Sequence, residues 1–491
     1  MPRPGRRLLR FLLLVAALVA AAIAVAPFAP LDALKPTVES RLSAALGRPT
    51  QVGSVRLSLL GGPYLVRHGV TAKEDPAFGD GNFLEADQVR ANLALLPFAL
   101  RREVVIEALD LKSPQFTFVK KDVWSWTTLG PAHQESSESL EGLAWPAVAY
   151  LIAVDPSIDA VSLENATVRL VDPSNTASPE SLYKNVALRA DITREPSGSS
   201  RRVAGVLRAQ SDPDQGADLL RADIRFDLTV DRGASRDLIV RGQLGPGRLE
   251  TKSLAADSFK SSLDYKENRL VLDEMDLSLY EGTLAGRMDL DLRSQRFAAE
   301  GRVANLNLDQ AIGAKLQMPG QITGHIDADF KLDGVLRSFQ ETVPTVNGSG
   351  RLSSSDLFIA SVNLSEQVAR ALRLNEIGDM SAGTKVGSLQ SEFQIIQGQV
   401  RTTNLLLGQL DGLGDARSDQ GWFRVVSTPT LDYVATVLLT PDATARVKSA
   451  SPLLGFAITM LEDRNRVAVP VNIRGEVRNP VVQVDVSRIF R

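Results

Sequence analysis

Apolar and polar residues alternate one by one over much of the chain beyond residue 50. Residues 222–231 (ADIRFDLTVD) and residues 325–333 (HIDADFKLD) show the alternation most clearly. Successive side chains of a β-strand point to opposite faces, so a strand with this pattern presents one apolar face and one polar face. The pattern predicts β-strands in these two ranges and in residues 186–192, 284–293 and 467–473.

Turn-forming residues separate the alternating segments. Gly, Asn, Asp and Pro recur between them at short intervals, which is typical of strands joined by tight turns. The sequence therefore predicts a mainly β chain whose strands form an antiparallel meander.

The segments between the N-terminus and the main run of strands include a helix and a linker. Residues 31–46 have a helical pattern that ends at Gly47, with Pro49 shortly after, a common arrangement at helix ends. Residues 130–142 (GPAHQESSESLEG) are polar and acidic, which predicts a linker or mobile loop. Residues 143–154 are apolar but too short to span a bilayer as a helix, so we expect a buried or interfacial segment.

Helices that could cover the apolar face of the sheet are few. Leu364, Val368 and Leu372 mark the apolar stripe of a short helix, and residues 452–463 predict a second one. Because an apolar sheet face has to be covered, either two sheets pack together or the sheet curls and its lining meets another apolar partner, such as lipid. The candidate lining residues of such a groove are Ile224, Phe226, Leu228, Ile326, Phe330 and Leu332.

The N-terminus combines a basic tail with an apolar run. Residues 11–26 (FLLLVAALVAAAIAVA) approach the length that spans a bilayer core as a helix. The four arginines before this run predict a cytoplasmic N-terminus and an exported body. A cleaved signal peptide is the alternative, because residues 24–26 have the A-x-A form, although cleavage there would leave Pro27 first. The predicted anchor includes Phe11, Leu14, Leu18 and Ile23, and the topology signal consists of Arg3, Arg6, Arg7 and Arg10.

Composition and charge weigh against several classes of function. The 491 residues include 55 Lys and Arg against 58 Asp and Glu, so no basic field favours nucleic acid. Cysteine is absent, which excludes disulfides, thiol nucleophiles and zinc–thiolate sites. The three histidines (His68, His133 and His325) lack zinc-ligand spacing, and no nucleophile or phosphate-binding motif is present. We therefore expect no enzyme activity, no metal and no cofactor.

Two regions of the chain resemble the AsmA family. Within residues 39–129, the segments LSAALGRPTQVGSVRLSLLGGP, KEDPAFGDGNFLEADQVRANLALLP and EALDLKSPQFTFVKKDVWSWTTL are similar to the family's opening helix and first strands. Within residues 346–486, NGSGRLSSSDLFI, GWFRVVSTPTLDYVATVLLTP and NRVAVPVNIRGEVRNPVVQVDV resemble its closing strands. Between them, LSLYEGTLAGRMDLDL resembles a Y-G-G turn of the family, with Glu281 in place of the first glycine.

The resemblance implies an architecture and a role. AsmA-like proteins hang from the inner membrane by one N-terminal helix, and their periplasmic body is similar to repeating β-groove lipid-transfer proteins. Larger relatives are held to carry phospholipid toward the outer membrane, and the family was first linked to outer-membrane protein assembly. The resemblance implies inner-membrane and phospholipid partners, and no catalytic residues, because the family has none assigned.

The pattern and the resemblance together give one predicted fold. It is mainly β: an N-terminal transmembrane helix followed by a long, twisted, mostly antiparallel β-sheet curled into a groove, with a few short helices. About 16–20 strands at ~4.8 Å each would give a sheet too short for the gap between two bilayers, so we expect a second copy or a periplasmic or outer-membrane protein as partner. A periplasmic scaffold or assembly factor with a self-packed β body is the alternative function.

The predicted divisions of the chain are a cytoplasmic tail and anchor (1–30), an N-terminal β region with its opening helix (31–130), an acidic linker with a short apolar segment (131–158), a middle meander (159–345) and a C-terminal β region with two short helices (346–491).

Overall fold

The computed structural model of the chain describes residues 35–58, 64–94, 105–121, 124–128, 158–173, 179–195, 200–232, 238–251, 254–313, 320–337, 339–371, 383–411, 413–424, 429–450, 466–477 and 479–485. The predicted anchor, the acidic segment, the apolar segment 143–154 and the predicted helix 452–463 lie outside these residues. Within these residues, no helix is both long enough and apolar enough to cross a membrane.

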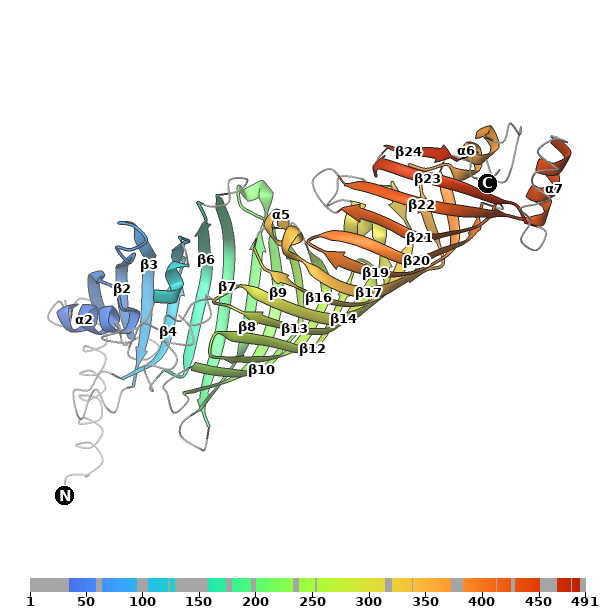
Figure 1. Cartoon of the computed structure of the whole chain (residues 1–491). Helices are drawn as coiled ribbons and strands as arrows, with labels where there is room; N and C mark the ends of the chain where they lie inside the picture. Colours follow the sequence, from blue (N-terminus) through green and yellow to red (C-terminus); the bar gives the residue numbers. More distant parts are fainter. Residues whose placement is uncertain are drawn as a thin grey trace, which may run out of the picture. The chain divides into compact units, whose positions relative to one another are not determined.

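The described residues confirm the prediction of a mainly β chain with few helices (Figure 1). They include 24 strands that are assigned to one sheet. The chain divides into two compact units: unit 1 comprises Met1–Leu254 and Ser262–Arg269, and unit 2 comprises Ala255–Ser261 and Leu270–Arg491. The predicted five-part division of the chain stays a prediction.

Unit 1 contains the first ten strands. Strands β1 to β3 form antiparallel pairs, as do strands β6 to β10. The described bounds are β1 (Thr50–Ser58), β2 (Tyr64–Lys73), β3 (Asn82–Leu93), β4 (Ile106–Lys112), β5 (Gln115–Val119), β6 (Ala160–Val171), β7 (Glu180–Arg194), β8 (Arg201–Ser211), β9 (Leu220–Arg232) and β10 (Leu238–Thr251), with short helical turns at Ser125–Thr128 and Pro213–Gln215.

One step in unit 1 departs from the predicted antiparallel meander. Strand β3 pairs antiparallel with both β4 and β5, but β6 runs parallel to β4 and to β5. A tight hairpin can join only antiparallel strands. The connection into β6 is therefore a crossover, which the pattern of turn residues did not predict.

Helix α2 (Lys35–Leu46) confirms the described part of the predicted first helix. It is followed by Gly47 with a φ of 67°, a left-handed conformation that favours glycine at helix ends. Leu46 is buried together with Val52 of β1 and Val70 of β2. The end of the helix thus covers part of the apolar face of these strands.

A buried ion pair joins the end of α2 to the loop before β3. The side chains of Arg48 and Glu74 are only 1% and 3% exposed. Arg48 Nη2 also donates to the carbonyl oxygen of Ser125 at 2.6 Å and to Oγ1 of Thr128 at 2.9 Å. The guanidinium lies 5.2 Å from the centre of the Phe83 ring. Burial lowers the pKa of Arg48 to about 10, so the side chain stays charged at neutral pH.

Unit 2 contains most of the remaining strands. Each described strand pair from β13 onward is antiparallel. The described bounds are β11 (Ala255–Lys266), β12 (Arg269–Leu279), β13 (Gly282–Asp291), β14 (Arg296–Asn307), β15 (Ile322–Thr323), β16 (His325–Val335), β17 (Asn347–Ser354), β18 (Leu357–Ile359), β19 (Thr384–Ile396), β20 (Gln399–Leu410), β21 (Gly414–Arg424), β22 (Thr430–Leu439), β23 (Ala468–Glu476) and β24 (Asn479–Val484); the helical segments are Asp309–Gly313, α5 (Phe339–Thr342), Val343–Thr345, α6 (Leu364–Ala371) and α7 (Pro441–Ala450).

Helices α6 and α7 contribute to the buried core of unit 2. Leu364 and Val368 of α6 are 5% and 0% exposed, which confirms the described part of the predicted apolar stripe. Ala443 and Val447 of α7 belong to the same cluster, together with buried residues of β19 to β23. The two helices thus close one part of the apolar sheet face.

Helix α7 was not predicted from the sequence. Its segment (PDATARVKSA) is polar on most sides, so only Ala443 and Val447 indicate an inner face. The start of the helix nevertheless carries a signal, because Thr440 Oγ1 accepts a hydrogen bond from the N–H of Ala443 and Pro441 occupies the first turn. A hydroxyl cap followed by proline is a typical helix start.

The predicted alternation is confirmed in β9 and β16. In β9, Phe226 and Leu228 are 4% and 3% exposed, whereas Arg225 is exposed. In β16, Phe330 is half-buried and its neighbour Asp329 is exposed. Each strand therefore has one apolar face and one polar face, as its sequence pattern requires.

The Arg48–Glu74 pair provides a test of what holds the N-terminal strands to α2. Replacing Arg48 by Met leaves the Glu74 carboxylate buried without its partner, which costs about 3–5 kcal/mol. The double variant Arg48→Met/Glu74→Leu should recover most of this loss, because it buries no unpaired charge. Urea unfolding of the full-length protein in detergent measures both; a single variant as stable as the wild type would contradict the role of the pair.

Candidate functional site

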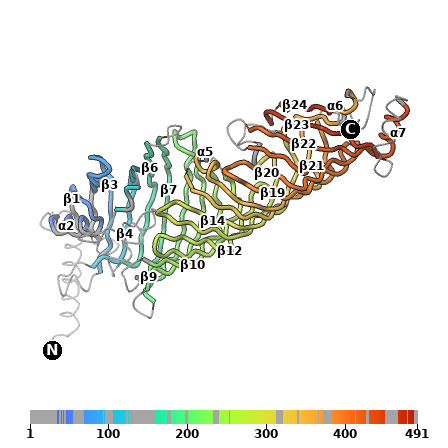
Figure 2. The backbone as a smooth tube through the Cα atoms, in the orientation of Figure 1, coloured from blue at the N-terminus to red at the C-terminus, as the bar shows by residue number. Residues whose placement is uncertain are grey.

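The candidate site is the apolar face of unit 2, where paired residues on successive strands form rows across the sheet. Figure 2 shows the backbone of these strands between β14 and β22. One row crosses the strands from β14 to β22, and each of its members is paired in register with the next. It consists of glycines, aromatic residues and one threonine, and contains no charged side chain. The members of this glycine–aromatic row are Gly301, Phe330, Gly350, Phe393, Thr402, Gly421 and Tyr433.

A second row lies beside the first on the same face, because its residues are two positions away along each strand. All of its members are apolar or glycine, and all are half-buried. Partly exposed apolar residues that lie side by side form a patch, and such patches mark candidate binding surfaces. The members of this aliphatic row are Ala299, Leu332, Gly348, Ile395, Val400, Phe423 and Leu431.

The aromatic rings of the first row lie over glycines of neighbouring strands. A Cβ atom added at Gly350 would lie 2.5 Å from Cζ of Phe393, and one added at Gly301 would lie 3.2 Å from Cζ of Phe330. At Gly421 the added atom would overlap the ring of Tyr433. The rings therefore occupy the space that a side chain on the neighbouring strand would otherwise fill.

The opposite face of the same strands is a ladder of alternating charges. Lys331 Nζ lies 3.0 Å from a carboxylate oxygen of Glu300, and Arg351 Nε lies 3.3 Å from one of Glu392. These side chains are largely exposed, so each pair contributes little to stability. The ladder keeps one face of the sheet in water and leaves the apolar face as the candidate for an apolar ligand.

The six residues predicted to line a groove fall into two sets. Those on β9 lie in unit 1, and those on β16 lie in unit 2. The β9 set is mostly buried, as in a packed core, whereas the β16 set is only half-buried, as in an open face. The β9 set is Phe226 and Leu228, both buried, with Ile224 half-buried; the β16 set is Ile326, Phe330 and Leu332.

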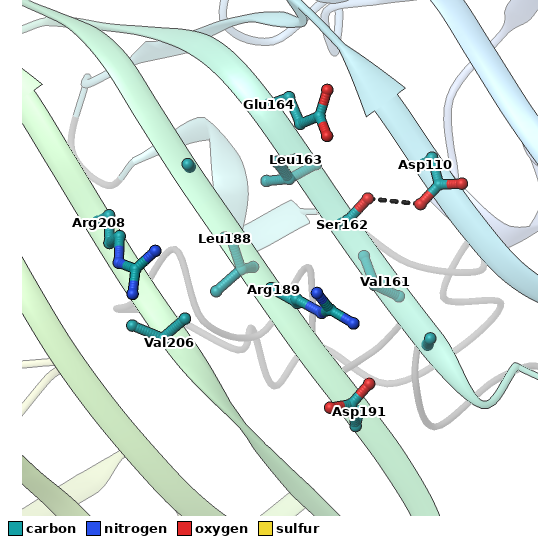
Figure 3. A pocket seen from close by; sticks show the side chains of 12 residues that line it. Asp110, Val161, Ser162, Leu163, Glu164, Leu188, Arg189, Asp191, Val206 and Arg208 are labelled. Carbon is teal, nitrogen blue, oxygen red and sulfur yellow. Dashed lines mark hydrogen bonds between the residues drawn. The ribbon is translucent and has the colours of Figure 1, made fainter.

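A hollow of about 400 Å³ lies on the polar face of unit 1, across β4, β6, β7 and β8 (Figure 3). Asp110, Ser162 and Arg189 are paired in register across its floor, and Ser162 Oγ donates to Asp110 Oδ1 at 2.5 Å. Phe226 belongs to the other face, because its row passes through Val161. The hollow is therefore lined by apolar residues together with charges of both signs, and it does not belong to the face that carries Phe226.

His325 is held by two carboxylates at the start of β16. Its Nδ1 lies 2.7 Å from Oδ2 of Asp356, and its Nε2 lies 3.7 Å from Oε2 of Glu281. The hydrogen bond with Asp356 raises the pKa of His325 above its ordinary value. Glu281 also accepts hydrogen bonds from Asn307 and Gln310. The cluster ties the ends of neighbouring strands together. In the described part of the chain, no group of three or more His, Asp or Glu side chains is arranged so that it could hold a metal ion.

The glycines of the candidate site were not predicted from the sequence. Gly348 and Gly350 belong to a segment that resembles the AsmA family, and they occupy the apolar positions of β17, on the same face as Leu352. The available signal was their spacing. Glycine at every second position of an alternating strand lies on one face of that strand, and it marks a site where another group approaches the backbone closely instead of a turn. Which aromatic ring covers each glycine depends on strand register, which one sequence does not reveal.

Comparison with known families supports the resemblance for the N-terminal part of the chain. The AsmA family matches residues 6–225, which confirms the predicted relationship there. The match ends within β9, so the resemblance in residues 346–486 stays a prediction. No curated protein matches the chain.

Charged substitutions distinguish the packed set from the open set. Phe226→Asp buries an unpaired carboxylate, so we expect a loss of several kcal/mol in the free energy of unfolding. Phe330→Asp should cost clearly less, because water already reaches that half-buried position. Urea unfolding of the full-length variants measures the difference; equal losses would show that the two faces are packed alike.

Proposed function

We propose, from the AsmA family match over residues 6–225 and the apolar face of unit 2, that this protein holds or passes phospholipid acyl chains along its sheet. The observation that carries the proposal is the pair of uncharged rows from β14 to β22, in which every member except the buried Thr402 is half-buried. Such a role would support lipid homeostasis of the outer membrane.

The proposed mechanism is passive. Apolar contact contributes roughly 0.8 kcal/mol per buried CH₂ group, so a continuous lining holds an acyl chain without specific binding residues. Headgroups stay in water, where the charged ladder of the opposite face is also solvated. The proposal includes no catalytic step and no cofactor.

The proposed location is the periplasmic side of the inner membrane. The basic tail and apolar run of residues 1–30 have the composition of a single-pass anchor with a cytoplasmic N-terminus. In that arrangement α2 leads from the membrane toward the sheet. A second copy of the chain, or a periplasmic or outer-membrane protein, is the proposed partner that extends its reach.

A scaffold or assembly factor for outer-membrane proteins is the second candidate. It is favoured by the burial of Phe226 and Leu228 in unit 1, which is the burial of a self-packed core. In that case the body would bind protein rather than lipid.

Photo-crosslinking in cells tests the lipid proposal against the scaffold. A benzoylphenylalanine probe at Phe330 should capture phospholipid, because that side chain lies on the half-buried apolar face. The same probe at Asp329, one residue away on the polar face, is the matched control and should capture none. Mass spectrometry of the adducts identifies what is bound.

The outcomes separate the two candidate functions. Lipid adducts at Phe330 but not at Asp329 support the lipid role. Only protein adducts, at both Phe330 and Phe226, would favour the scaffold and overturn the lipid proposal.

A reporter tests the proposed location. The four arginines before the apolar run hold the tail inside the cell, so alkaline phosphatase fused after Arg491 should be active, because it folds only after export. Fusion after a variant with those arginines replaced by Glu controls for the charge. A soluble body that has lost residues 1–26 would show a cleaved signal instead of an anchor.

A further inference from the structure

The ring of Tyr433 lies flat across a whole strand of unit 2. Tyr433 on β22 is paired with Gly421 on β21, which is paired in turn with Thr402 on β20. The Tyr433 hydroxyl accepts a hydrogen bond from Thr402 Oγ1 at 3.4 Å, two strands away. A ring that stood upright on the sheet could not reach so far, because two strand spacings measure about 9.6 Å. Burial of the ring also raises the pKa of Tyr433.

The same arrangement recurs along the apolar face. Phe393 covers Gly350, Phe330 covers Gly301, and Phe297 of β14 lies against Gly334 of β16. A ring that lies over a glycine adds apolar surface without projecting far above the sheet. The rings thus form a flat apolar surface on this face and leave the space above it open.

We propose that the glycines beneath these rings determine how much space above the sheet is open to an acyl chain. Glycine keeps each ring low, so that a chain can lie along the glycine–aromatic row, perpendicular to the strands. This inference rests on the proposed lipid function and names the residues that decide which chains fit. A flat, uncharged surface without projecting side chains fits straight acyl chains, so these are the proposed class of ligand.

The length of the row agrees with such a ligand. From β14 to β22 the row spans six strand spacings, or about 29 Å. The hydrocarbon core of a bilayer is ~30 Å thick and holds two chains end to end. One chain therefore fits within the row and has room to move along it.

Gly421 and Gly334 are the positions where the effect of a side chain is cleanest. The three atoms nearest to an added Cβ at Gly421 all belong to the Tyr433 ring, and those at Gly334 belong to Phe297 and to the Thr345 hydroxyl. At Gly350 and Gly301 the added atom would also meet backbone oxygen atoms. Alanine at Gly421 or Gly334 should therefore lift a ring with little effect on strand pairing.

The experiment uses the full-length protein in cells with a benzoylphenylalanine probe at Phe423. This residue lies in the aliphatic row, two positions from Gly421 on the same face. Gly421→Ala should lower the yield of phospholipid adduct by roughly tenfold, which corresponds to lost contact with about two methylene groups. Adding Tyr433→Leu to Gly421→Ala should restore the yield, because the raised ring is then gone.

A second variant and two controls keep the outcomes distinct. Gly334→Ala, read with a probe at Leu332, should show the same loss through Phe297. Gly81→Ala is the neutral control, since an added Cβ there meets nothing within 4 Å. Protease resistance comparable to the wild type shows that each variant is folded.

The outcomes distinguish failure of the inference from failure of the proposed function. An unchanged yield in folded Gly421→Ala and Gly334→Ala, with the wild type capturing lipid, would overturn the inference and leave the proposed function standing. Failure of the double variant to restore the yield would show that the ring is not the cause. Absence of lipid adducts in the wild type at Phe330 and Phe423 would instead overturn the proposed function.

Discussion

A sheet with one apolar face has to cover that face, and this constraint governs each unit of the protein. In unit 1, Leu46 at the end of α2 packs on Val52 and Val70. In unit 2, α6 and α7 bury the ends of β19 to β23. Between β14 and β22 the described helices leave the glycine–aromatic and aliphatic rows only partly covered. This partly covered area is where we propose that an acyl chain binds.

The polar face solves a different problem. A long strand with an alternating pattern could slip in register, and a slip by one residue would exchange its two faces. Opposite charges at paired positions, such as Lys331 with Glu300 and Arg351 with Glu392, match only in one register. Their value to stability is small, but a slipped register would place like charges or apolar residues in their positions. The ladder therefore helps to specify which face becomes apolar.

The sequence was informative where a pattern is local. Spacing along the chain alone predicts three features: the alternating faces of β9 and β16, the end of α2 at Gly47, and the apolar stripe of Leu364 and Val368. Long-range features were not accessible: the ion pair of Arg48 with Glu74 and the parallel step into β6 depend on which segments meet. Helix α7 was missed because two inward residues are too few for a periodic signal. The openness of the β16 face and the burial of the β9 face could not be separated, since both have the same alternation.

The pairing of a ring with a glycine has a consequence for how such a chain can change over generations. Tyr433 and Gly421 lie on different strands, yet a side chain at position 421 would overlap the ring as long as Tyr433 is present. A larger residue at position 421 displaces the ring unless the ring has already been lost, whereas losing the ring first removes the constraint on the glycine. The order of substitutions is therefore restricted, and the two positions are expected to change together instead of independently.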